Sequence, residues 1–155
     1  MRVQYKRLQR GKDKYAPLKK IHSIKRKNDS SYVRFIVVHN TATKPDMLLS
    51  ELDRLQYHYL ITKAGILLSL KSVKAQDGTI EIALVGGLDK EGNRVDCRTP
   101  RQNETLFNTL VLLTERHKLA KIIAADRLYV YGFPNPGFDV LDWIANYTPN
   151  FLKAV

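Results

Sequence analysis

The histidine at the end of an apolar run has the clearest chemical potential in this chain. His39 follows Val37 and Val38 and precedes a hydroxyl-rich turn that contains Thr41 and Thr43. An imidazole at this place is a common zinc ligand, because its neutral ring offers a nitrogen lone pair to the metal. The alternative is a strand-end histidine that bonds a backbone carbonyl or one of the two threonine hydroxyls.

The only cysteine limits the other chemistry that the chain can carry. Cys97 excludes an intrachain disulfide and a cysteine-based zinc cluster, and its isolation fits a reducing compartment. Arg98 beside it favours a lower thiol pKa, but the sequence shows no base for a catalytic thiol. Gly86 and Gly87 indicate a turn that ends a strand, because no further glycine pattern makes them a phosphate cradle.

The positive charge is concentrated at the N-terminus. Residues 1–28 hold eleven basic residues against the single acid Asp13, which leaves +10 of the chain's net +11 in this segment. The basic residues are Arg2, Lys6, Arg7, Arg10, Lys12, Lys14, Lys19, Lys20, Lys25, Arg26 and Lys27. Everything after residue 28 is close to neutral.

This basic arm has two interpretations. Composition alone is satisfied by a solvated arm without fixed structure. The sharper hypothesis is that these eleven residues bind an anionic partner: nucleic acid, an acidic protein groove or a lipid surface. Interleaved tyrosine, leucine and isoleucine side chains favour an arm that also anchors on a partner protein or on the body of the fold. We therefore expect an assembly or a protein partner, with nucleic acid as a further candidate.

Composition favours one folded domain after the arm. The chain has 155 residues and a hydrophobic fraction of 44%, enough to bury a core without disulfides. No apolar run approaches the roughly 20 residues of a membrane-spanning helix. The first residues are basic with no apolar stretch behind them, so we expect no secretory signal. A cytoplasmic or particle-associated protein is expected.

Short apolar runs predict strands and two amphipathic stretches predict helices. Strands are predicted at residues 32–38, 57–61, 66–70, 80–85 and 122–125, and the second and third of these form a hairpin. Helices are predicted from Thr43 through Leu48, Leu49, Leu52 and Leu55, from Thr99 to about His117, and over residues 138–147. Residues 132–137 are predicted as a loop.

These elements predict an α/β fold, a mixed central β-sheet flanked by helices. The predicted division is a basic arm at residues 1–31 and a domain at residues 32–155.

With the elements in this order, the chain resembles the type-2 N-acetylmuramoyl-L-alanine amidases. This family comprises zinc amidases that include phage lysozyme-type enzymes and the peptidoglycan recognition proteins. The matching segments are residues 35–45, 57–61, 82–89, 96–102 and 136–139. The resemblance implies an amidase-like mixed sheet over residues 33–145.

The resemblance also implies a zinc site made from two histidines, a third ligand and an assisting tyrosine. His39 matches the first ligand and Tyr57 matches the tyrosine. The second histidine position falls near Asp126 or Arg127, so it carries no histidine. The third ligand position falls at Asn135, whose neutral amide oxygen binds zinc weakly.

We therefore expect no cofactor, with His39 and Tyr57 as vestiges of the site. The alternative cofactor is zinc, held at a repurposed site by His39, Asp126 and Asp139. Tyr57 has a second interpretation as a core tyrosine with its hydroxyl near the surface. His58 is expected to face away from the site if Tyr57 faces it.

The substrate groove of the family is expected to be reduced here. The connections before residue 57 and before residue 80 are short compared with those of the family, and Glu81 stands where a glycine is usual. Losing ligands and groove together favours a catalytically inactive, amidase-like binding or structural component of a phage, prophage or secretion-type particle. Peptidoglycan is a disfavoured partner. The alternative function is a divergent zinc-dependent amidase that cleaves peptidoglycan.

Overall fold

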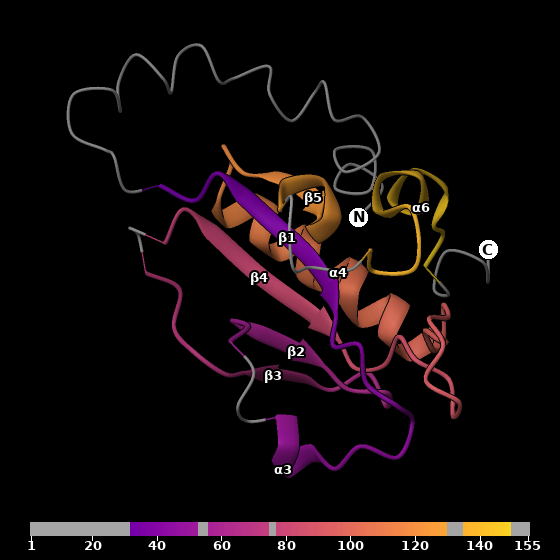
Figure 1. The fold of residues 1–155 in the computed structure, drawn as a ribbon. Helices are drawn as coiled ribbons and strands as arrows, with labels where there is room; N and C mark the ends of the chain where they lie inside the picture. Colours follow the sequence, from indigo (N-terminus) through magenta and orange to yellow (C-terminus); the bar gives the residue numbers. More distant parts are fainter. Residues whose placement is uncertain (1–31, 53–55, 75–76, 130–134, 150–155) are drawn as a thin grey trace, which may run out of the picture.

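A five-stranded mixed sheet forms the centre of the computed structural model, with strand order β3-β2-β4-β1-β5 (Figure 1). The structure describes residues 32–52, 56–74, 77–129 and 135–149. The predicted basic arm, Leu55 and the predicted loop up to residue 134 therefore lie outside the described residues. The α/β class with a mixed sheet is confirmed.

Four of the five strands run parallel to one another. β1 (Phe35–Asn40) pairs with β4 (Thr79–Leu84) and β5 (Lys121–Ala124), both in parallel. β2 (Tyr59–Ile61) pairs in parallel with β4 and antiparallel with the edge strand β3 (Leu67–Ser69). The predicted hairpin between the second and third strands is therefore confirmed.

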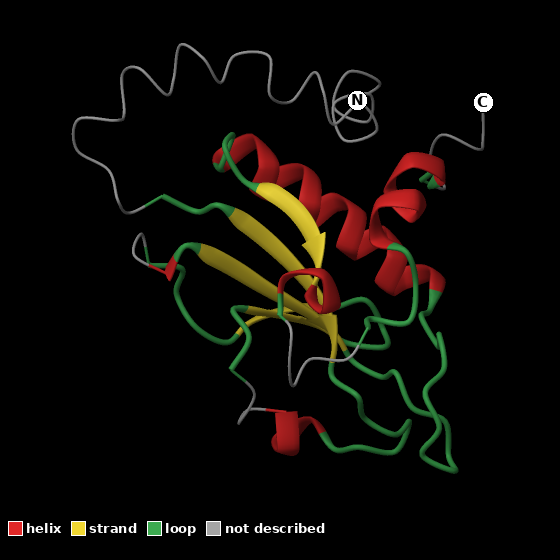
Figure 2. Cartoon of the chain, turned by 45° about the horizontal axis from the view of Figure 1, so that its top comes forward, coloured by secondary structure: helices red, strands yellow, loops and turns green. Residues whose placement is uncertain are grey.

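Side chains alternate between the two faces of the sheet, and the faces differ in character. One face, called the helix face below, packs against α4 (Pro100–Arg116) and α6 (Val140–Asn146) (Figures 1 and 2). The buried residues that share this core are Val33, Ile36, Val38, Ile61, Ile80, Ile82, Leu84, Leu106, Phe107, Leu110, Leu113, Ala120, Val140 and Ile144. The opposite face, called the histidine face, carries His39 and Glu81 on neighbouring strands.

The helix α4 begins where the sequence predicts it. The Thr99 side chain accepts from the Gln102 amide, and the Gln102 side chain accepts from the Thr99 amide, which completes a capping box before Pro100. The helix ends at Arg116, next to the C-cap His117. Its apolar stripe lies on the helix face of the sheet, as predicted.

Gln102 also attaches α4 to the sheet. Its side chain is fully buried, and its Nε2 donates to the backbone oxygens of Ile61 at 3.2 Å and Val85 at 2.9 Å. These carbonyls come at the ends of β2 and β4, and Ile61 O also accepts from the Val85 amide, so one side chain bonds the ends of both strands. The start of α4 is thereby fixed over the carboxyl ends of the parallel strands.

The helix predicted from Thr43 is wrong in its start, and its predicted last residue, Leu55, lies outside the described residues. Thr43 instead extends β1, because its amide donates to Gly86 O at 3.0 Å and it forms an isolated bridge with Gly87. The helix of this segment, α3 (Leu49–Leu52), has four residues. Leu48, predicted on its buried stripe, is 65% exposed. Pairing with the residues after β4 overrides the local helix signal here.

β5 and α6 lie close to their predicted positions, whereas a short helix after β5 was not predicted and begins at Ala125, which the prediction places in the strand. β5 leads directly into the short helix α5 (Ala125–Leu128), and α6 begins after Asp139, whose carboxylate accepts from the Asp142 amide at 2.9 Å. Within the described part of the chain, no helix is long and apolar enough to cross a membrane.

Candidate functional site

His39 and Glu81 meet on the histidine face of the sheet. His39 Nε2 lies 2.5 Å from Glu81 Oε2, and the two side chains are 2% and 13% exposed. The contact arises because β1 and β4 are parallel neighbours, which brings together residues 42 positions apart in the sequence. The prediction that His39 bonds Thr41 or Thr43 misses this partner; the two threonine hydroxyls bond each other at 2.7 Å.

Two hydroxyl groups hold the second oxygen of the Glu81 carboxylate. Tyr129, just after α5, donates a hydrogen bond to Glu81 Oε1, and Thr79 donates to the same oxygen at 3.1 Å. Burial by itself would raise the pKa of Glu81, but the bonds from His39 and Tyr129 outweigh it and lower the pKa. Burial and the same contact raise the pKa of the Tyr129 hydroxyl. Glu81 is therefore an ionised carboxylate that only accepts hydrogen bonds.

Tyr57 completes this group, called the His39 cluster below: His39, Tyr57, Thr79, Glu81 and Tyr129. The rings of Tyr57 and His39 have centroids 5.0 Å apart, and the Tyr129 ring lies 6.1 Å from His39 on a nearly parallel plane. Burial, followed by the nearby Glu81 charge, raises the pKa of Tyr57. The tyrosine thus stays protonated. The structure brings together His39 and Tyr57, the two residues that the resemblance matches to the family's site.

His58 does not join the cluster through its ring. Its Nδ1 accepts a hydrogen bond from the Glu81 backbone amide at 2.9 Å, and its Nε2 lies 3.1 Å from Asp77 Oδ2. A nitrogen that accepts from an amide carries no proton, so the ring proton sits on Nε2 and is donated to Asp77. His58 therefore works as a structural link between β2 and β4.

Hydrogen bonds to each other or to the backbone are made by Asp126, Asn135 and Asp139. The Asn135 amide donates to Asp126 Oδ2 at 3.1 Å, while the Asn135 oxygen accepts from the Gly137 amide at 2.7 Å. Asp139 caps α6. Asp126 and Asp139 line a cavity of about 470 Å³, and Asp126 Oδ1 is a buried acceptor without a donor. His39 is not among the residues that line this cavity.

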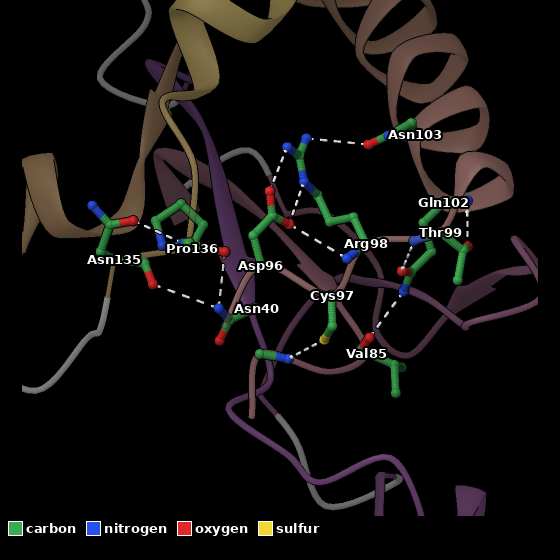
Figure 3. A network of polar contacts seen from close by, with 12 residues as sticks. Asn40, Val85, Asp96, Cys97, Arg98, Thr99, Gln102, Asn103, Asn135 and Pro136 are labelled. Carbon is green, nitrogen blue, oxygen red and sulfur yellow. Dashed lines mark hydrogen bonds and ion pairs between the residues drawn. The ribbon is translucent and has the colours of Figure 1, made fainter. Parts of the chain in front are cut away.

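Asn40, which sequence reasoning did not single out, holds the segment after residue 134 in place. Its Nδ2 donates to Pro136 O at 2.9 Å (Figure 3). Its Oδ1 accepts from the Ala42 amide at 2.9 Å. Gly87 must be glycine beside it, since a Cβ there would lie 2.5 Å from the Asn40 side chain. The end of β1 is thus bonded to the segment that carries Asn135.

In this arrangement Nε2 of His39 is not placed to bind a metal. Glu81 is ionised and accepts only, so the proton between it and His39 belongs to Nε2, which then has no lone pair to offer a metal. Asn135 is a neutral amide whose oxygen already accepts from Gly137. Among the described residues, no three His, Cys, Asp or Glu side chains are grouped to hold a metal ion. His39, Asp126 and Asp139 do not form a ligand set.

The sequence carried a signal for one of the missed residues. Glu81 is a charged residue in an otherwise apolar strand, and a buried charge needs a partner on the same face of the sheet. Tyr129 carried no such signal, because its place over Glu81 depends on the turn from β5 into α5.

The fold is similar to that of phage and bacterial amidases. No protein-family model matches the chain, and no curated protein matches it in sequence. Among solved structures, the Ph2119 endolysin from Thermus scotoductus MAT2119 bacteriophage Ph2119 has a TM-score of 0.55 at 18% identity, covering 80% of this chain and 93% of the endolysin.

A second solved structure, the N-acetylmuramoyl-L-alanine amidase LysC from Clostridium intestinale URNW, also has a TM-score of 0.55 at 18% identity. It covers 74% of this chain and 83% of the amidase. These likenesses establish an amidase-like fold.

Proposed function

We propose that this chain is a catalytically inactive, amidase-like protein that serves as a binding or structural component, in a phage, prophage or secretion-type particle. One observation carries the proposal: the nitrogen of His39 that faces the cluster is held by the Glu81 carboxylate. A histidine ligand must present a lone pair to the metal. Here Nε2 presents a proton to an ionised carboxylate.

The rest of the His39 cluster supports this interpretation. Glu81 accepts from His39, Tyr129 and Thr79, so its two oxygens are bonded on both sides. A metal on Nε2 of His39 would break its hydrogen bond to the largely buried Glu81 carboxylate, leaving that carboxylate with the bonds from Tyr129 and Thr79 alone. The arrangement bonds β1, β4 and the residue after α5 to one another.

Zinc affinity of the full-length chain tests the proposal. We expect isothermal titration of zinc into the wild-type protein to give no stoichiometric binding, with His39→Ala giving the same titration. Elemental analysis of protein purified without chelator gives an independent value. One zinc per chain that disappears in His39→Ala contradicts the proposal, because it requires ligands that the cluster does not provide.

The second part of the proposal assigns partner binding to the basic arm. The support is the net charge of +10 in residues 1–28, which suits an anionic partner such as nucleic acid or an acidic subunit surface. If phosphates dominate, the logarithm of the affinity falls with the logarithm of salt concentration at about −0.9 per contacted phosphate of a duplex. An acidic protein partner leaves nucleic-acid binding weak at every salt concentration.

Binding of duplex nucleic acid by a variant with fewer charges in the arm distinguishes a nucleic-acid partner from an acidic protein partner. In the full chain, Lys19→Gln, Lys20→Gln, Lys25→Gln and Lys27→Gln together should weaken duplex binding and flatten the salt dependence. The matched control replaces Lys44, Lys71, Lys74 and Lys118 by glutamine, which removes equal charge from the domain. Equal losses in both variants contradict a specific role of the arm.

The second candidate function, a divergent zinc-dependent amidase, is favoured by the ring contact between His39 and Tyr57. It requires the Glu81 carboxylate to leave His39 when a metal binds. Loss of turbidity of purified cell walls, abolished by a chelator and by His39→Ala, would establish it. We expect no loss of turbidity from the wild-type chain.

A further inference from the structure

A lysine and the chain's only cysteine lie in contact at the carboxyl ends of the parallel strands. Lys63, in the turn after β2, places its Nζ 3.0 Å from Cys97 Sγ and donates to the Cys97 backbone oxygen at 2.7 Å. The second bond fixes the ammonium group beside the sulfur. Cys97 precedes the capping box of α4 (Figure 3).

Gly86 makes this contact sterically allowed. Its φ of +128° is unfavourable for other residues, and a Cβ there would lie 2.6 Å from Lys63 Nζ and 2.9 Å from Cys97 Sγ. The next amide, that of Gly87, donates to Cys97 Sγ at 3.1 Å. The glycine pair that ends β4 therefore makes room for the two side chains and supplies a donor to the sulfur.

These donors favour the thiolate form of Cys97. Burial alone would raise the pKa of the thiol, but the hydrogen bonds from Lys63 and the Gly87 amide outweigh burial and lower it. The thiolate is the form that reacts with peroxides. The side chain is only half-buried, which leaves a path for a small oxidant.

We propose that Lys63 and Cys97 form a modification site at which a peroxide produces a covalent sulfur–nitrogen link between the two side chains. The inference rests on their contact geometry and is independent of the function proposed for the His39 cluster.

The steps balance with hydrogen peroxide as the only oxidant. The Cys97 thiolate attacks one peroxide oxygen, the O–O bond breaks, and the products are the sulfenic acid and hydroxide. The hydroxide takes a proton from the Lys63 ammonium to give water and a free amine. The amine then attacks the sulfenic sulfur, an S–N bond forms, and the S–O bond breaks as a second water leaves. The sulfur is oxidised by two electrons and the peroxide is reduced to water.

The surrounding structure accepts the link with little movement. The Thr99 hydroxyl donates to Lys63 O at 2.7 Å, and the Thr105 hydroxyl donates to Gly65 O at 2.6 Å, so the turn after β2 is already attached to α4. The two reacting atoms, Lys63 Nζ and Cys97 Sγ, start 3.0 Å apart and need only approach to bonding distance. The link would close a loop of 34 positions and strengthen this attachment.

Peptide mapping of the full-length protein after peroxide treatment tests the proposal. We expect the monomer to lose the mass of two hydrogen atoms and one free thiol, with a peptide containing Lys63 joined to one containing Cys97. A thiol reductant should restore both. Disulfide-linked dimers or a sulfinic acid at Cys97, with Lys63 unmodified, would overturn the proposal.

Two variants of Lys63 distinguish the role of its amine nitrogen from the role of its positive charge. Lys63→Arg keeps the cation but removes the amine, so the link should be absent and the sulfenic acid should instead be trapped by a cyclic diketone. Lys63→Gln should give the same absence and move the pH profile of thiol alkylation to higher pH. The control Lys118→Gln should form the link like the wild type. A link in either Lys63 variant contradicts the assignment.

Discussion

The two faces of the sheet use the same strands for different purposes. On the helix face, Ile36, Val38 and Ile82 pack against the apolar stripe of α4. On the histidine face, the alternate positions carry His39 and Glu81, which are hydrogen-bonded to each other beside Tyr57 and Tyr129. The helix face is stabilised by apolar burial, whereas the histidine face combines a smaller apolar cluster, Leu60, Ala83 and Val85, with directional bonds.

This difference shows which part of an enzyme-like fold can change while the fold persists. The helix face depends on volume and pattern, so apolar substitutions that conserve both are tolerated. The histidine face depends on particular donors and acceptors. One residue there, such as Glu81, changes the hydrogen bonds and the pKa values of the side chains around it. An amidase-like fold can therefore be retained while the chemistry of its site differs.

The largest effect is expected from a cavity on the helix face. Leu106→Ala should lower the free energy of unfolding by about 2–5 kcal/mol, because Leu106 is fully buried between α4 and the sheet. Urea unfolding followed by circular dichroism measures it. Leu112 on the same helix is 69% exposed, and Leu112→Ala should change the value by less than about 0.5 kcal/mol. Similar losses in both variants would contradict the described packing of α4.

A smaller effect is expected on the histidine face. Glu81→Gln places an amide where His39 and Tyr129 both donate, so one donor faces another. We expect a loss of about 1–3 kcal/mol at neutral pH, with unchanged stability of the exposed-loop control Glu91→Gln. The measurement is urea unfolding at a series of pH values.

The pH dependence of that loss has a definite sign. The folded-state pKa of Glu81 is lowered, so its ionised form adds stability above the unfolded-state pKa, and this stability disappears as pH falls through the folded value. The difference between wild type and Glu81→Gln should therefore be constant near neutrality and shrink below about pH 4. A difference that grows on acidification contradicts an ionised Glu81 in the folded protein.

The helix face could be predicted from the sequence because its signals are local. Thr99, Pro100 and Gln102 define the start of α4 within four positions, and apolar spacing defines its buried stripe. The strands were predicted to within a few residues for the same reason. Local signals failed at Thr43, where pairing with Gly87 outweighs a proline and a capping pattern.

The histidine face could be predicted only in part, since its contacts join distant segments. The resemblance singled out His39 and Tyr57, whose rings do meet. The partner of His39 lies 42 positions away and becomes visible only when β1 and β4 are known to be parallel neighbours. Lys63 and Cys97, 34 positions apart, meet through a turn and a glycine pair in the same way.

A variant of the capping box tests whether α4, which covers the helix face, is stabilised by the hydrogen bonds of its first turn. Thr99→Ala removes the acceptor for the Gln102 amide and the donor to Lys63 O, and should cost about 0.5–2 kcal/mol. The exposed Asn108 lies in the same helix, and Asn108→Ala serves as the control. Hydrogen exchange should locate the change in the first turn of α4. Unchanged exchange there would contradict a stabilising cap.

The smallest effect is expected in the segment where the sequence misleads. A helix starting at Thr43 would bury Leu48, whereas the structure leaves Leu48 65% exposed and packs its neighbour Met47 against the apolar residues of the histidine face. Leu48→Ser should therefore change the free energy of unfolding by less than about 0.5 kcal/mol, and Met47→Ser should cost more. Urea unfolding of the two variants compares adjacent residues in opposite environments. A larger loss from Leu48→Ser would restore the predicted helix, because only that helix buries Leu48.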